Sequence, residues 1–297
     1  MNDQMQSTQP SVAVIGGGSF GTAVVKMVTD NLGRCHWWMH NEESALHIKR
    51  YHHNPRYLSS VGFQPGSIHI YTDVNAAVAQ ADIVIFAVPS AFVKEVLEGM
   101  AEGALAGKLV CSTIKGIIPD ENMIVGEYLR EVVGVPEENI VVITGPCHAE
   151  EIALERLSFL TVAAKEKAVA ERVAGVLKNH YMRCTLSTDI YGTEYAAVMK
   201  NIYAIAAGMY HGLGYGDNFQ AVLISNAARE MRRFMKSTGE GPINIKKSAY
   251  LGDLLVTCYS QFSRNRMLGN MLGKGYTVKS AKAEMTMVAE GYYAVPL

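Results

Sequence analysis

The sequence predicts an α/β fold in which a doubly wound, mostly parallel sheet is followed by an all-α domain. Up to about Ser187, short apolar, β-branched runs alternate with stretches of helical spacing. Parallel neighbours need crossover connections, so this alternation favours a parallel sheet. After Ser187 the chain is Ala-rich and helical in pattern, with no convincing strand. Because 297 residues exceed the usual size of one domain, we expect two, at residues 1–187 and 188–297.

The predicted elements alternate between strand and helix through the first domain. The first strand is followed by a glycine turn and then by helical spacing to about Leu32. Two later strands end at turn residues, Pro89 and Gly145. Strands are expected at residues 11–15, 35–39, 82–88, 108–113, 139–144, 159–164 and 182–186, and helices at residues 91–100, 191–211 and 217–237, with an Ala- and Glu-rich helix between the last two strands.

Composition excludes several classes of protein. Hydrophobic residues make up 49% of the chain and charged residues 19%, which argues against disorder. The net charge of −1 gives no indication of nucleic acid or an anionic membrane as partner. Five cysteines without a C-x-x-C pair favour reduced thiols, with neither a disulfide framework nor a metal site. The first ten residues lack the apolar core of a signal peptide, and no apolar run approaches the ~20 residues of a membrane span. We therefore expect a cytoplasmic protein without membrane insertion.

The pattern Gly16-x-Gly18-x-x-Gly21 follows the first predicted strand and opens a helix. The first glycine allows the turn, the second lets backbone approach a pyrophosphate, and the third allows close helix–strand packing. The pattern predicts a Rossmann-like, dinucleotide-binding domain; the alternative is a tight turn in a Gly-rich protein. His40 and Asn41 stand where an acid would suit NAD and a basic residue NADP, so both cofactors stay open.

Two lysines are candidates for the reaction. Lys115 follows a predicted strand, at the carboxyl edge of the sheet where ligands bind in such folds. Lys200 lies inside the apolar, Ala-rich helix, where an ammonium is costly unless it is paired or lines a cavity. Burial and nearby cations lower a lysine pKa toward neutrality, which suits a proton donor or acceptor. The alternative is a snorkelling lysine at a domain seam. We expect Asp253 to orient Lys200, to bind a substrate hydroxyl, or only to cap a helix.

The segment from Leu251 to Arg266 is the main indication of a substrate class. Ser263, Arg264 and Asn265 place a hydroxyl, a guanidinium and an amide in succession at the expected start of a helix. A helix N-terminus favours anions, and a guanidinium can grip two phosphate oxygens at once. Such a segment is also often only a cap with solvated charges. With the glycine turn and the lysines, it favours a hydride-transfer enzyme acting on a small phosphorylated carbonyl compound.

Taken together, these motifs resemble the glycerol-3-phosphate dehydrogenases of the bacterial, NAD(P)-linked type. In family order, from residue 12 to about 291, the chain contains G-G-G-S-F-G-T-A, N-P-R-Y-L, A-V-P-S, T-I-K-G-I, T-G-P-C-H-A-E-E, K-N-I-Y-A-I-A-A-G and L-G-D-L-L-V-T-C-Y-S-Q-F-S-R-N-R. The resemblance implies reversible reduction of dihydroxyacetone phosphate by NAD(P)H to sn-glycerol 3-phosphate, for glycerophospholipid synthesis. It leaves the oligomeric state open, a homodimer included.

The resemblance also implies roles for individual residues. Lys200 would bind the substrate and be the proton donor and acceptor, while Lys115 and Arg264 would touch both substrate and cofactor. The other expected substrate contacts are Gly145, Cys147, Asp253, Ser263 and Asn265. The other expected cofactor contacts are Gly16, Gly18, Ser19, Phe20, Gly21, His40, Ala149, Val288 and Glu290, and no metal is implied.

Three features depart from the pattern of the family. Cys147 stands where the family usually has Ser or Thr, so a weak thiol or a backbone contact would face the substrate. His148 stands where a phenylalanine is usual. The chain ends at Leu297, whereas the resemblance implies further helical segments in relatives. Two other hypotheses stay open: a related dehydrogenase acting on phosphogluconate, hydroxyisobutyrate or ketopantoate, and a non-catalytic dinucleotide-binding relative.

Overall fold

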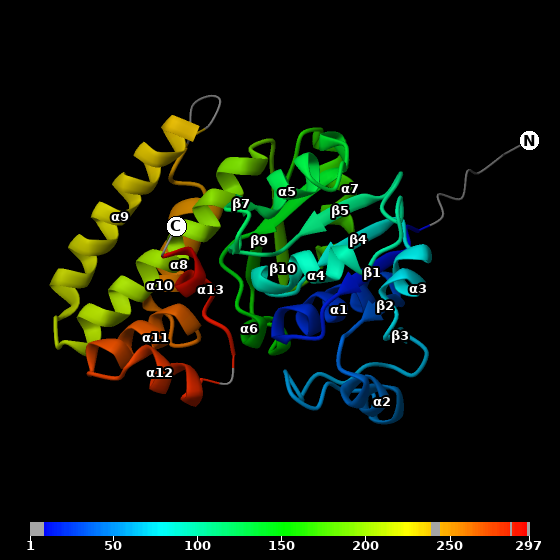
Figure 1. Ribbon diagram of the computed structural model, residues 1–297, viewed down its shortest axis with the longest axis horizontal. Helices are drawn as coiled ribbons and strands as arrows, with labels where there is room; N and C mark the ends of the chain where they lie inside the picture. The colour runs from blue at the N-terminus through cyan, green and yellow to red at the C-terminus, as the bar shows by residue number, and fades with distance from the viewer. Residues whose placement is uncertain (1–8, 239–243, 286, 296–297) are drawn as a thin grey trace, which may run out of the picture.

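The computed structural model describes residues 9–238, 244–285 and 287–295, which form a sheet with covering helices and, beside it, a group of helices (Figure 1). The strands of the sheet end at Ser187, and every described element from Ile190 onward is helical. Residues 1–8, on which the signal-peptide prediction partly rests, and residues 296–297 at the chain end lie outside the described residues.

One eight-stranded sheet forms the centre of the first domain. Its strands are β1 (Val12–Ile15), β2 (Cys35–Trp38), β3 (Ile68–Tyr71), β4 (Ile83–Phe86), β5 (Leu109–Ser112), β8 (Ile140–Thr144), β9 (Ser158–Ala164) and β10 (Met182–Ser187); β6 (Ile117–Ile118) and β7 (Met123–Ile124) form a separate hairpin. The order is β10-β9-β8-β5-β4-β1-β2-β3. The central strands β1, β4, β5 and β8 are buried along their whole length, as expected for β-branched runs covered on both faces.

The mostly parallel sheet is confirmed, and one antiparallel step lies within it. All neighbouring strands are parallel except β8 and β9, where Thr144 pairs with Thr161. The chain therefore leaves β8 and re-enters the sheet at the same edge. The connection contains α6 (Ala149–Ala153), which packs on α1. This return places residues 147–149 at the carboxyl edge of the sheet.

Helices cover both faces of the sheet, which is the doubly wound arrangement that the sequence predicts. On one face, α1 (Ser19–Leu32), α2 (Glu42–Tyr51) and α7 (Lys167–Leu177) share an apolar core with the strands. On the other face, α3 (Val74–Ala79), α4 (Val93–Glu98) and α5 (Val125–Glu131) form a second core with alternate strand residues. Short 3₁₀ turns η1 (Ser90–Phe92) and η2 (Glu137–Asn139) precede α4 and β8.

The second part of the chain is built around α8 (Ile190–Gly212). It contacts α9 (Asp217–Thr238), the π-helical turn η3 (Ser248–Gly252), α10 (Asp253–Tyr259), α11 (Arg264–Gly273) and α13 (Glu290–Ala294), while α12 (Val278–Glu284) packs on α11. The same helix also contacts α5, β8 and β9 (Figure 1). Within this contact the Glu194 carboxylate accepts a hydrogen bond from the Gly126 N–H at the start of α5 (2.9 Å).

Glycines bring α8 and α11 into backbone contact. A Cβ at Gly269 would collide with the Ile205 carbonyl, and one at Gly208 would collide with the Arg266 carbonyl. Only glycine fits at such a crossing, so the two helix axes are held close. Since α8 carries Lys200 and α11 begins at Arg264, this contact fixes the spacing between the two predicted functional residues.

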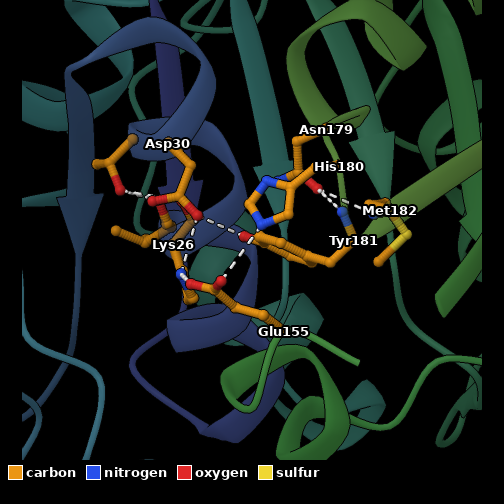
Figure 2. A network of polar contacts seen from close by, with 9 residues as sticks. Lys26, Asp30, Glu155, Asn179, His180, Tyr181 and Met182 are labelled. Carbon is orange, nitrogen blue, oxygen red and sulfur yellow. Dashed lines mark hydrogen bonds and ion pairs between the residues drawn. The ribbon is translucent and has the colours of Figure 1, made fainter. Parts of the chain in front are cut away.

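A polar network braces the helix that begins at the glycine turn (Figure 2). Lys26 and Asp30 lie on α1 and pair with each other at 2.9 Å. Lys26 also pairs with Glu155 at 2.9 Å, and the Tyr181 hydroxyl donates to Asp30 Oδ2 at 2.5 Å. Tyr181 directly precedes β10, and its side chain is buried. The network therefore ties α1 to the β9–β10 side of the sheet.

Most predicted elements are present, with ends shifted by a few residues. The helices expected at residues 191–211 and 217–237 are α8 and α9, and the one expected at 91–100 is η1 followed by α4. The sequence interpretation missed β3, α2, α3, the β6–β7 hairpin, α5 and α6. These are short and carry polar residues, such as His69 in β3, so their apolar periodicity is weak. The domain boundary at residues 187/188 stays a prediction; it falls between β10 and α8.

Candidate active site

A cavity of about 230 Å³ lies between the carboxyl edge of the sheet and the helices of the second domain. Its wall includes the glycine turn, the ends of β4 and β5, the start of α6, the middle of α8, and the starts of α10, α11 and α13. Segments more than 250 residues apart in the chain, such as Gly18 and Glu290, therefore face one space. Such a position, at the edge of an α/β sheet and between domains, is typical of a ligand site.

The glycine turn has the geometry that a phosphate approach requires. Gly16 has φ +135°, and a Cβ there would lie 2.7 Å from the Ala87 carbonyl oxygen. A Cβ at Gly21 would collide with the Gly16 carbonyl, so α1 packs tightly on the turn. By contrast, nothing lies within 4 Å of the Cβ position at Gly18, which lines the cavity. The backbone at Gly18 is therefore open to a ligand.

Buried polar side chains hold this turn in place. Asn54 is 1% exposed, and its amide donates to the Gly17 carbonyl at 3.0 Å and to the Thr22 hydroxyl at 2.9 Å. The Thr22 hydroxyl in turn donates to the Gly18 carbonyl at 2.8 Å. The indole N–H of Trp37 donates to the Gly16 carbonyl at 2.8 Å. Because these bonds are shielded from water, the turn is rigid before any ligand arrives.

Lys200 lies at the centre of a buried polar cluster. Its Nζ donates to Asp253 Oδ1 at 2.5 Å and to the Thr257 hydroxyl at 3.0 Å. The Thr257 hydroxyl donates to the Asp253 carbonyl at 2.6 Å. Lys115 Nζ reaches Asp253 Oδ2 at 3.5 Å and the Gly145 carbonyl at 3.2 Å. The Asp253 carboxylate therefore forms ion pairs with two ammonium groups, one from each domain.

This arrangement shifts the pKa values of the two lysines in opposite directions. Burial lowers the pKa of Lys200; Asp253 opposes the shift, and the positive charge of Lys115 reinforces it. Burial also acts to lower the pKa of Lys115, but the attraction of the Asp253 carboxylate prevails and raises it. Lys200 is thus the more easily deprotonated of the two and suits proton transfer, while Lys115 stays a fixed positive charge.

The start of α11 presents the hydroxyl, guanidinium and amide that the sequence places in succession. Ser263 caps the helix, with its hydroxyl accepting a hydrogen bond from the Arg266 N–H at 3.3 Å. Ser263 is therefore a cap, and Ser263, Arg264 and Asn265 also line the cavity; phosphate binding by this segment stays a prediction. Arg264 forms no ion pair with another described residue in the structure, so its guanidinium is available to an anion.

Residues at the start of α13 link the two domains close to Lys115. The Glu290 carboxylate accepts hydrogen bonds from the Ser90 hydroxyl at 2.5 Å and the Ser90 N–H at 3.1 Å. Gly291 N–H donates to Asn265 Oδ1 at 2.9 Å. Asn201, next to Lys200, donates through its amide to the Lys115 carbonyl at 2.8 Å. The bonds of Glu290 with Ser90 and of Asn201 with Lys115 cross between the domains, so the cavity is assembled from both.

The structure brings together most residues that the sequence analysis names. The cavity wall contains Gly18, Ser19, Phe20, Lys115, Cys147, Ala149, Lys200, Asp253, Ser263, Arg264, Asn265, Val288 and Glu290. Gly16 and Gly21 shape the turn behind it, and Gly145 accepts from Lys115 without lining it. His40 is exposed after β2 and is not among the residues of the wall.

Several residues of the site escape sequence reasoning. Thr257 holds Lys200, Ser90 holds Glu290, and Asn54 supports the glycine turn. Thr257 lies four residues after Asp253, so a helical projection could have placed both on one face. No local signal marks Ser90, because its partner is 200 residues away.

The described residues fit a dinucleotide better than a metal. The open backbone at Gly18 and the neighbouring Ser19 and Phe20 would hold its phosphates and adjoining groups, with Lys115 supplying positive charge. Lys115 Nζ also lies 5.9 Å from the centre of the Phe20 ring. Within the described ranges, no three His, Cys, Asp or Glu side chains are placed to hold a metal ion. None of the described helices is long and apolar enough to cross a membrane.

Comparison with known proteins gives consistent matches along the chain. Residues 11–170 match the model of the NAD-dependent glycerol-3-phosphate dehydrogenase N-terminus, and residues 189–297 match that of the C-terminus. The NAD(P)+-dependent glycerol-3-phosphate dehydrogenase of Ectopseudomonas mendocina is 38% identical over 287 residues, covering 97% of this chain and 83% of the relative. The Bacillus subtilis enzyme of the same name is 38% identical over 281 residues, covering 94% and 81%.

A solved structure supports the same relationship. The crystal structure of glycerol-3-phosphate dehydrogenase from Coxiella burnetii superimposes with a TM-score of 0.87 at 27% sequence identity. The superposition covers 97% of this chain and 87% of that one. The likeness therefore extends over both the sheet domain and the helical domain.

Proposed function

The chain belongs to the NAD-dependent glycerol-3-phosphate dehydrogenase family, and on that premise we propose that it reduces dihydroxyacetone phosphate to sn-glycerol 3-phosphate with NAD(P)H, reversibly. The observation that carries the proposal is the cavity in which the glycine turn, the Lys200–Asp253 pair and Arg264 meet. The product would supply glycerophospholipid synthesis. NAD and NADP both stay open as cofactor, since the His40 side chain lies apart from the cavity.

In this proposal the cofactor supplies the hydride, and the chain supplies position, charge and the proton. Arg264, with Ser263 and Asn265, binds the phosphate of the substrate. Lys200 donates a proton to the oxygen of the reacting carbonyl group, and takes it back in the reverse direction. Asp253 and Thr257 keep the ammonium of Lys200 in one orientation, so little reorganisation is needed during the reaction. Lys115 stabilises negative charge where cofactor and substrate meet.

Replacement of Lys200 tests the proposal. Purified protein should oxidise NADH or NADPH when dihydroxyacetone phosphate is added, and Lys200→Ala should lower kcat by about 10²–10⁴-fold, as expected when a general acid is lost. NADH binding, followed by fluorescence, should persist in the variant. Lys279→Ala, which removes an exposed lysine on α12, is the matched control. Wild-type turnover in Lys200→Ala would exclude Lys200 as the proton donor.

The same assay separates the other hypotheses. A related hydroxyacid dehydrogenase would act on another substrate, such as a non-phosphorylated oxoacid or phosphogluconate, and would ignore dihydroxyacetone phosphate. A non-catalytic relative would bind NADH without turnover. No contact in the structure favours either hypothesis over the phosphorylated triose.

Two further parts of the proposal concern location and assembly. We place the enzyme in the cytoplasm because its five cysteines are free and four of them are buried. A homodimer stays a proposal, which the mass in solution, measured by light scattering after size-exclusion chromatography, would test.

A further inference from the structure

His148 is a polar side chain in the cavity wall, and its buried Nε2 forms no hydrogen bond with the described residues. It directly precedes α6 and lines the cavity between Cys147 and Ala149. Its Nε2 is shielded from solvent and has no hydrogen-bond partner among the described residues. A histidine that served only packing would usually satisfy both ring nitrogens, because an unpaired buried polar atom is costly.

Positive charge surrounds the His148 ring. Burial lowers its pKa to about 4, and the positive charges of Lys200, Lys115 and Arg264 act in the same direction against a single carboxylate, Asp253. The imidazole is therefore neutral near pH 7, with one nitrogen a donor and the other an acceptor. Two other carboxylates line the cavity, but Glu290 accepts from Ser90 and Glu150 from Ser19. The space near His148 thus favours an anionic ligand.

The ring of His148 lies against the phosphate-binding segment proposed above. Its centre is 6.1 Å from that of Phe262, which directly precedes Ser263 and Arg264. The contact joins the α6 side of the cavity to the start of α11. The χ2 torsion of a histidine is soft, so the ring can turn Nε2 toward a ligand while keeping its contact with Phe262.

We propose that His148 is a substrate-binding and specificity-determining residue, whose Nε2–H donates a hydrogen bond to the phosphate group of the bound triose phosphate. The proposal rests on the proposed function and adds a second element, the α6 side of the cavity, to a phosphate receptor otherwise formed at α11. It explains why a polar atom is left unpaired where three cations converge. An anion at this place would supply both the missing acceptor and the missing negative charge.

His148→Phe tests the proposal, because phenylalanine keeps an aromatic ring in contact with Phe262 but removes both ring nitrogens. We expect the KM for dihydroxyacetone phosphate to rise roughly 10- to 100-fold, the loss typical of a hydrogen bond to a charged group, with a smaller change in kcat. The Kd of inorganic phosphate, measured by calorimetry, should rise by a similar factor. NADH affinity should not change. His148→Gln, which returns a donor near the Nε2 position, should recover part of the loss.

His211→Phe, at an exposed histidine near the end of α8, is the matched control and should leave every constant unchanged. An unchanged phosphate Kd in His148→Phe would overturn the proposal, whether or not KM rises. A loss of NADH affinity equal to the loss of phosphate affinity would also overturn it, by indicating a structural role. Because the phosphate measurement needs no turnover, it is separate from the proposed function. Absent turnover of the wild-type enzyme on dihydroxyacetone phosphate would contradict that function alone.

Discussion

At the scale of single residues, the chemistry depends on how one carboxylate is shared. Asp253 is 1% exposed and contacts both Lys200 and Lys115. Removing one charged partner of such a buried group leaves the charges of the others uncompensated. The protonation state of each of these three residues therefore depends on the other two. Cys147 lies in the same cluster, and burial raises the pKa of its thiol, so at neutral pH it is a weak donor to the Gly145 carbonyl and not a thiolate.

Asp253→Asn should move the pH profile of the reaction in a defined direction. Burial lowers the pKa of Lys200 and the charge of Asp253 raises it, so losing that charge lowers the pKa further. With Lys200 as the proposed proton donor, reduction of dihydroxyacetone phosphate needs its ammonium form, so kcat should fall as pH rises through this pKa. The falling limb should therefore shift to lower pH in Asp253→Asn. Asp217→Asn, at an exposed position on α9, is the control. A shift to higher pH would contradict the assignment of the limb to Lys200.

At the scale of elements, the crossing of α8 and α11 decides how far Lys200, the proposed proton donor, lies from Arg264 in the proposed phosphate receptor. The glycines at this crossing permit an approach that no larger residue allows, because a Cβ at Gly269 meets the Ile205 carbonyl of the other helix. The rigid helices then carry Lys200 and Arg264 in fixed positions. A shift of either helix by a fraction of an ångström at the crossing would therefore change the distance between Lys200 and Arg264, and with it the fit of the substrate.

Gly269→Ala should separate the two helices. We expect it to lower the free energy of unfolding by about 1–3 kcal/mol, the usual cost of overpacking, and to raise the KM for dihydroxyacetone phosphate. NADH affinity should change little, since the glycine turn lies on the other domain. Gly175→Ala on α7 is a matched control: nothing lies within 4 Å of its Cβ position, so better helix propensity should stabilise the protein slightly. For both variants, urea denaturation measures the free energy of unfolding and steady-state kinetics measures the KM. Equal effects in the two variants would show that the crossing has no special role.

At the scale of the whole molecule, the site exists only where two domains meet. Glu290 and Gly291 at the start of α13 connect back to Ser90 on the sheet domain and Asn265 on α11. Burial raises the pKa of Glu290, while the two Ser90 donors act to lower it and favour the carboxylate. Gly116, next to Lys115, has no room for a Cβ because the Ser90 and Glu290 side chains pack against it. The link therefore supports the loop that carries Lys115.

Ser90→Ala should weaken the link between the domains. It removes the hydroxyl donor to Glu290 and leaves the Ser90 N–H as the remaining donor, at a cost of about 1–2 kcal/mol in unfolding free energy. The loss of unfolding free energy should be larger at neutral than at acid pH. The lost hydroxyl stabilises the carboxylate form of Glu290, which is present at neutral pH. As pH falls, Glu290, whose pKa is raised, takes up a proton and no longer depends on that donor. Thermal unfolding at several pH values measures this. Ser60→Ala, at an exposed position, is the control. Identical pH dependence in Ser90→Ala and wild type would contradict the role of Glu290.

The sequence by itself determined the features that local patterns encode. Buried strands such as β4 are continuous apolar runs rich in β-branched residues, the glycine turn has fixed spacing, and α8 is a long Ala-rich segment. The start of α11 was predictable because capping residues act within one turn of the helix they begin. Each of these depends on neighbours a few residues away, which the sequence displays directly.

The tertiary structure alone decided the contacts between residues distant in the chain. The antiparallel step at β8–β9, the pairing of Ser90 with Glu290, the support of the turn by Asn54 and the free Nε2 of His148 have no local signal. Their energies depend on burial and on partners that folding brings together from both domains. Local spacing identifies the groups that can act, and tertiary packing decides which of them meet, because a hydrogen bond needs its partners within a few ångströms and charge interactions weaken with distance.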